Sequence, residues 1–228
     1  MPQVNIFKWR PGSGWIVLSG GGDPASGDVQ AIEAASLTRT LSQGPIAYLW
    51  AAGDVDSADR HMDLLRDLGA RTGYLVDLVG EEDDVIYRDI NEAGVIIQGD
   101  GPSTRTLRDA LEGIALSAIA EAFERGATVY AAGASAGILG AAFVERGTLY
   151  DGFSWLASAL IMPGYTTDQA ADLRTWLRGV PEGFGLGLGA GAGIAFGPRG
   201  EVEVLGNSAV TVSLGQSYDP GTLLKDRR

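Results

Sequence analysis

The pentapeptide Gly133-Ala134-Ser135-Ala136-Gly137 constrains the fold more than any other segment of the chain. It follows the apolar run 127–132 and precedes the small-residue segment 138–144, so a buried strand, a tight turn and a helix are predicted in that order. Only small residues fit beside the serine, because the chain turns sharply there. This order is typical of a serine nucleophile elbow. We therefore expect the Ser135 hydroxyl to stand above the edge of a sheet and to face a cavity.

Apolar strands alternate with helices through the first two thirds of the sequence. The predicted strands are 15–19, 46–50, 74–76, 95–97 and 127–132; the predicted helices are 29–41, 56–68, one starting at 81–84, and 106–125. Because these strands are apolar throughout, they predict a mostly parallel sheet covered on both faces. Segments 193–196, 201–205 and 209–214 predict an antiparallel hairpin or meander. We therefore expect one α/β domain over 1–228, a three-layer α/β/α sandwich with a C-terminal hairpin.

Composition excludes several kinds of site. The net charge of −12 argues against a nucleic-acid surface, which needs lysine and arginine. The chain has no cysteine and one histidine, which excludes disulfides, cysteine-ligated metals and a histidine-rich zinc site. No metal or cofactor is predicted. The apolar stretch 15–18 is too short for a signal peptide or a membrane span, so we expect a cytoplasmic protein.

The glycine run 185–193 contains G-x-G-x-x-A matches, which raise the alternative of dinucleotide binding. That motif lies between a strand and a helix, whereas a hairpin is predicted here. Close packing of the backbone against a neighbouring segment is therefore the favoured interpretation.

Five segments together resemble the dipeptidase E and cyanophycinase family of serine peptidases. They are residues 18–22, 96–100, 133–137, 162–169 and 185–188, and the resemblance extends over nearly the whole chain. It implies a fold like that of class I glutamine amidotransferases and a Ser-His-Asp or Ser-His-Glu arrangement. Members of the family cleave small acidic dipeptides or the β-linked aspartyl-arginine polymer cyanophycin.

The resemblance assigns Ser135 as the nucleophile and the backbone N–H groups of Gly99 and Ala136 as oxyanion donors. The family's catalytic histidine is missing, because Ala170 occupies its place in the segment 168–171. Gln98 replaces the first of two family glycines, and two carboxylates are absent from the run 185–190. The expected pocket would be lined by Gln98, Asp100, Tyr165, Gln169, Ala170 and Arg174.

Another base for Ser135 is hard to find. The two lysines, Lys8 and Lys225, lie near the chain ends, and the charged neighbours of His61 predict a solvated surface histidine. Among the carboxylates Asp151, Asp168 and Asp172, Asp168 is the favoured candidate, although a carboxylate of ordinary pKa is a weak base for an alcohol.

Three hypotheses remain open. In the first, the chain is a degenerate family homologue that keeps the fold, the elbow and the pocket but lacks efficient serine peptidase chemistry, and it acts as a binding protein. In the second, it is a working hydrolase with a carboxylate base. In the third, it has a different activity or an interaction role on the same scaffold. The expected ligand is a small peptide or an amino-acid-like molecule, with neither nucleic acid nor membrane as a partner. A homodimer is one possible oligomeric state.

Overall fold

The computed structural model describes residues 6–51, 55–99 and 103–218. Its larger sheet has the strand order β11-β10-β1-β5-β4-β2-β3. The five strands β1 to β5 are parallel, and β10 and β11 add an antiparallel edge. Their bounds are β1 Ile16–Ser19, β2 Ile46–Trp50, β3 Gly73–Asp77, β4 Val95–Gln98, β5 Thr128–Ala132, β10 Ala192–Phe196 and β11 Val202–Gly206.

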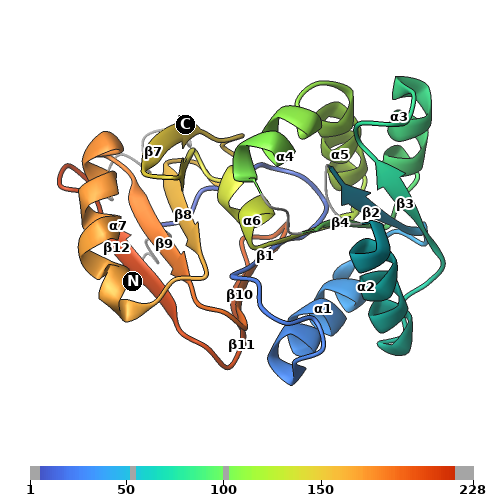
Figure 1. Ribbon diagram of the computed structural model, residues 1–228, viewed down its shortest axis with the longest axis horizontal. Coiled ribbons are helices and arrows are strands. Elements are labelled where there is room, and N and C mark those ends of the chain that lie inside the picture. The colour runs from blue at the N-terminus through green and yellow to red at the C-terminus, as the bar shows by residue number, and fades with distance from the viewer. Residues whose placement is uncertain (1–5, 52–54, 100–102, 219–228) are drawn as a thin grey trace.

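Helices cover both faces of this sheet (Figure 1). On one face lie α1 Gly27–Arg39 and α2 Val55–Asp67; on the other lie α3 Asp83–Asn91, α4 Thr104–Leu111 and α5 Ile114–Glu124. The split follows from right-handed crossovers, since the chain moves across the sheet one way through α1 and α2 and returns through α3 to α5. The predicted α/β/α sandwich with a mostly parallel sheet is confirmed.

The predicted helix 106–125 is wrong as a single element, because α4 and α5 are separate helices. Gly113 lies between them at φ 100°, a left-handed conformation that glycine adopts without steric cost. The chain therefore changes direction at this glycine, and α5 packs against α3 instead of continuing the axis of α4.

A second, five-stranded sheet has the order β12-β9-β8-β6-β7 and was not predicted (Figure 1). Its strands are β6 Ala142–Glu145, β7 Thr148–Asp151, β8 Ala159–Pro163, β9 Phe184–Leu188 and β12 Val210–Leu214, and α7 Ala170–Trp176 packs on it. The predicted helix 138–144 is also wrong. The helix after the pentapeptide, α6, spans only Ala134–Ile138, because two glycines weaken it and Phe143 and Val144 favour a strand.

The predicted C-terminal hairpin is confirmed in part. Strands β10 and β11 pair antiparallel with Ile194 opposite Val204, as a hairpin requires. Strand β12 instead leaves the hairpin and pairs with β9 in the second sheet, with Val212 opposite Leu186. Sequence periodicity cannot show such a change of partner, because both pairings present the same alternation of side chains.

The glycine run 185–193 packs closely, as expected. A Cβ at Gly185 would lie 2.6 Å from Leu173 Cδ1, and one at Gly187 would lie 2.6 Å from Tyr165 Cγ. These glycines let α7 and the segment before it approach β9. The run continues into strand β10 and not into a helix, which argues against a dinucleotide motif.

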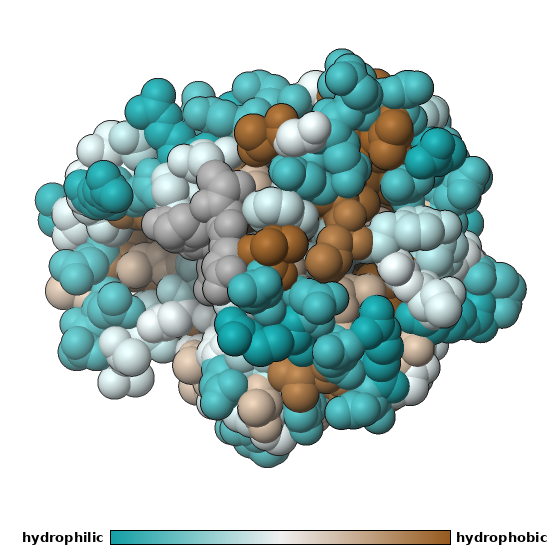
Figure 2. Space-filling view, turned by 45° about the vertical axis from the view of Figure 1, so that its right-hand side comes forward, coloured by the Kyte–Doolittle hydropathy of each residue, from teal (hydrophilic) through white to brown (hydrophobic). Residues whose placement is uncertain are grey.

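Two hydrophobic clusters fill the larger sheet's faces, and a third lies under α7. Figure 2 shows a mostly hydrophilic face, on which apolar residues gather near the centre and the upper right of the view. Within the described ranges, no helix combines the length and the apolar character needed to cross a bilayer.

Candidate functional site

Ser135 lies where the sequence predicts it, just after the carboxyl end of β5. The strand ends at Ala132, Gly133 turns the chain at φ 57°, and α6 begins at Ala134. The Gly133 N–H donates to the Ser19 carbonyl at 3.0 Å and so ties the turn to β1. The strand, turn and helix therefore occur in the expected order.

The Ser135 hydroxyl is buried, which differs from the expectation that it faces a cavity. The residue is 0% exposed. Its Oγ lies 2.7 Å from the carbonyl oxygens of Gln98 and Ala132 and 3.1 Å from that of Gly99, and it accepts from the Ala132 N–H at 3.2 Å. The short helix α6 packs against both α4 and β8. The hydroxyl thus links the ends of β4 and β5 through backbone atoms.

The two expected oxyanion donors already have intramolecular acceptors. The Gly99 N–H donates to the Leu49 carbonyl at 3.3 Å, and the Ala136 N–H donates to the Gly133 carbonyl at 3.0 Å. An oxyanion hole needs N–H groups aimed at the position where charge develops. Neither group is aimed at a free space beside the serine in this geometry.

No described hydrogen bond joins Ser135 to the expected pocket residues of segment 165–174. Asp168 and Arg174 are exposed, on the 3₁₀ turn η1 (Thr167–Gln169) and on α7. Gln169 accepts from the Thr166 N–H at 2.9 Å and closes that turn, while Ala170 begins α7 and is half-buried. Tyr165 is buried against Gly187. These residues belong to the second sheet and its helix.

Two further expected residues lie at the end of β4. Gln98 is 1% exposed, and both polar atoms of its side-chain amide lack a hydrogen-bond partner among the described residues. Its carbonyl oxygen receives the Ser135 hydroxyl. Asp100 lies outside the described residues.

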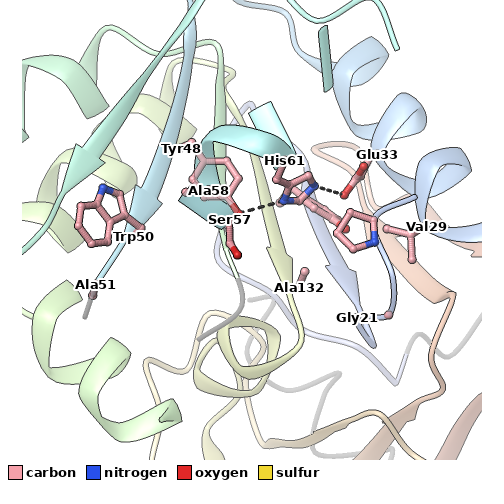
Figure 3. A pocket seen from close by; sticks show the side chains of 13 residues that line it. Gly21, Val29, Glu33, Tyr48, Trp50, Ala51, Ser57, Ala58, His61 and Ala132 are labelled. Carbon is pink, nitrogen blue, oxygen red and sulfur yellow. Dashed lines mark hydrogen bonds and ion pairs between the residues drawn. The ribbon is translucent and has the colours of Figure 1, made fainter. Parts of the chain in front are cut away.

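The prediction of a solvated His61 is wrong. His61 is 9% exposed; its Nε2 lies 2.7 Å from Glu33 Oε1 and its Nδ1 lies 3.0 Å from the Tyr48 hydroxyl (Figure 3). A sequence signal for this burial exists, since Ala58, His61, Met62 and Leu65 share the buried face of α2 at helical spacing. The charged residues between them belong to the solvated face.

Glu33 comes from α1 and completes a buried polar cluster with His61, Tyr48 and Tyr130. The Glu33 side chain is 0% exposed, and its Oε2, like the Tyr130 hydroxyl, has no hydrogen-bond partner among the described residues. Burial, and then the negative charge of Glu33, raise the pKa of Tyr130 above its ordinary value. Sequence analysis missed this cluster, because one histidine and one glutamate far apart in the chain give no motif.

A cavity of about 310 Å³ opens beside this cluster. It lies at the carboxyl ends of β1, β2 and β5, under α1 and α2 (Figure 3). Ligands in open α/β sheets bind at this edge. Ser135 is not among the residues that line the cavity. Among the described residues, no three His, Cys, Asp or Glu side chains are grouped so that they could hold a metal ion.

Solved structures share this architecture. The crystal structure of a peptidase from an acI-B1 Actinobacterium aligns with a TM-score of 0.67 and 15% identity, covering 90% of this chain and 93% of that one. A structure described as a "Putative Peptidase E Protein" from Listeria monocytogenes EGD-e aligns with a TM-score of 0.62 and 14% identity, covering 86% and 99%. The chain shares the fold of these two structures. No protein-family model and no curated protein sequence matches it.

Proposed function

We propose that this chain is a homologue of the dipeptidase E and cyanophycinase type that lacks efficient serine peptidase chemistry and instead binds a small peptide or an amino-acid-like ligand. The burial of the Ser135 hydroxyl among backbone carbonyls is the observation that carries this proposal. A nucleophile must reach a substrate carbonyl, and a hydroxyl at 0% exposure cannot do so without movement of the turn.

The missing base supports the same conclusion. The chain has one histidine, and both of its ring nitrogens are engaged by Glu33 and Tyr48. Ala170 occupies the place of the family's histidine and cannot accept a proton. Loss of the nucleophile or of the histidine from a serine triad reduces turnover by about 10⁶-fold. Residual catalysis by such a site would fall below the sensitivity of ordinary peptidase assays.

The alternative of a working hydrolase with Asp168 as base has less support. Asp168 is exposed on η1, and no hydrogen bond described in the structure joins it to Ser135. For this alternative, the exposed carboxylate and the buried hydroxyl would both have to move. An interaction role on the same scaffold is compatible with the fold, but no feature of the described surface favours it.

Hydrolysis of aspartyl dipeptides tests the proposal. We expect the wild-type protein to release no more amino acid than Ser135→Ala. We also expect Ala170→His to restore nothing, because the hydroxyl stays buried. Turnover by the wild type that is lost in Ser135→Ala would overturn the proposal. The variant Ala171→His, one residue further along α7, controls for the effect of a new histidine on that helix.

A further inference from the structure

We infer that the cavity beside His61 is a binding site for a small ligand that carries a protonated amine on an apolar body, with Glu33 as the counter-ion. This inference deepens the proposed function by naming the site and the chemical class of the ligand. It does not use Ser135, and it holds whether or not that serine reacts.

The first argument is the shape and lining of the cavity. Its volume of about 310 Å³ is at the lower end of the range for small-molecule sites. Pro24, Val29, Trp50 and Ala51 contribute apolar walls, and Gly21 and Gly22 border it at the end of β1 (Figure 3). A compact apolar or aromatic group fits such walls. Mostly apolar lining with a few convergent polar groups is typical of ligand sites.

The second argument is a buried carboxylate oxygen that has no hydrogen-bond partner among the described residues. Glu33 uses Oε1 to contact His61, which leaves Oε2 without a hydrogen-bond donor. The Tyr130 hydroxyl lies close to the side chains of Glu33 and Ser19, and both Glu33 and Tyr130 line the cavity. Buried polar groups are nearly always paired, because an unpaired one loses the hydrogen bonds that water gave it. A ligand donor in the cavity would restore this hydrogen bond when the Glu33 side chain, which is 0% exposed, turns its Oε2 toward the cavity.

The third argument is charge. The two hydrogen bonds of His61 fit the tautomer in which Nε2 donates to Glu33 and Nδ1 accepts from the Tyr48 hydroxyl, so the second oxygen of Glu33 is left for another donor. No lysine or arginine is found among the described residues that line the cavity. An ammonium group carries three donors and one positive charge, so it can serve both Glu33 Oε2 and the Tyr130 oxygen. A carboxylate placed directly beside Glu33 would be repelled, so the carboxylate of an amino-acid-like ligand must point away from Glu33.

Binding of 2-phenylethylamine, measured by calorimetry beside its uncharged isostere 2-phenylethanol, tests the inference. We expect the wild type to bind the amine at least tenfold more tightly than the alcohol. We expect Glu33→Gln, which keeps the shape of the side chain, to weaken amine binding about ten- to hundredfold, as loss of a charge-assisted hydrogen bond does. The matched control Glu201→Gln removes an exposed carboxylate that pairs with Arg199, and we expect it to change binding less than twofold.

His61 provides a readout that does not need a variant. It is the only histidine in the chain, so its imidazole NMR signals are assigned without ambiguity. The amine should shift them and the alcohol should not, even if Glu33→Gln fails to fold. Equal binding of amine and alcohol, or no binding of the amine at millimolar concentration, would overturn the inference.

The dipeptide assay keeps the two proposals apart. If the protein neither binds the amine nor hydrolyses dipeptides, the inference about the cavity is overturned, and the proposal that the chain lacks peptidase activity still stands. If the protein binds the amine and also hydrolyses dipeptides through Ser135, the cavity site is supported, and only the proposal that the chain lacks peptidase activity is overturned.

Discussion

Replacing Ser135 with alanine should destabilise the protein, because the hydroxyl acts in this account as a structural link between β4 and β5. Its Oγ lies within 2.7 Å of two backbone carbonyls and accepts one backbone N–H. The hydroxyl proton is donated to one carbonyl at a time, so the variant loses about one donated and one accepted hydrogen bond. At 0% exposure, water cannot replace them.

The expected loss follows from these contacts. A net hydrogen bond stabilises by about 1 kcal/mol, and a buried group left unpaired adds to the loss, so we expect Ser135→Ala to lower the free energy of unfolding by about 1–3 kcal/mol. For a chain of this size, that lowers Tm by about 2–12 °C. Urea unfolding followed by circular dichroism measures the free energy, and differential scanning calorimetry measures Tm.

Ser117→Ala is the matched control. Ser117 is exposed on α5 and its hydroxyl donates to the Gly113 carbonyl at 3.1 Å, where water can take its place. We expect this variant to change the free energy of unfolding by less than about 0.5 kcal/mol. If Ser135→Ala is as stable as the wild type or more stable, the hydroxyl is not a structural link, and an active-site serine under strain becomes the better interpretation.

Three further predictions concern stability. His61→Gln should lower the free energy of unfolding by about 3 kcal/mol in urea, because it disturbs the buried hydrogen bond between His61 and Glu33. Arg66→Gln, in an exposed ion pair, should cost less than about 1 kcal/mol, and equal losses would contradict the role of the buried hydrogen bond. Because the pKa of Tyr130 is raised in the folded protein, its contribution to the free energy of unfolding is complete below about pH 10 and falls at higher pH, where the phenol ionises in the unfolded chain. Tyr130→Phe should lose less stability over the same pH range, and parallel pH profiles of the unfolding free energy in the two proteins would contradict this. Gly187→Ala places a Cβ 2.6 Å from the Tyr165 ring and should lower the free energy of unfolding by about 1–3 kcal/mol in urea. The control Gly27→Ala, whose Cβ would have no atom within 4 Å, should leave that free energy unchanged.

The larger sheet could be predicted because its pattern is local. Strands such as Ile46–Trp50 are apolar throughout, and helices such as Val55–Asp67 end at glycine, so each element is recognisable without its neighbours. The second sheet could not be predicted from the sequence. Its strands β6 and β7 have only four residues each, and buried and exposed side chains do not alternate along either of them. Their pairing depends on contacts between segments distant in sequence.

The candidate site could be predicted only in part, for a related reason. The pentapeptide 133–137 predicts the strand, turn and helix correctly, because small residues and chain direction are local properties. Whether another segment covers the hydroxyl of Ser135 is a property of the packed molecule. The cluster of Glu33 and His61 was missed because these residues are 28 positions apart and meet only when α1 and α2 lie side by side on the sheet.

Labelling of Ser135 by a fluorophosphonate tests the central claim most directly. Intact-mass spectrometry of the folded protein after incubation with the reagent shows whether the hydroxyl reacts, with an active serine peptidase labelled in parallel to prove the reagent. The account predicts no added mass on the wild-type protein. Stoichiometric addition that disappears in Ser135→Ala would show an accessible, activated nucleophile and would contradict the account.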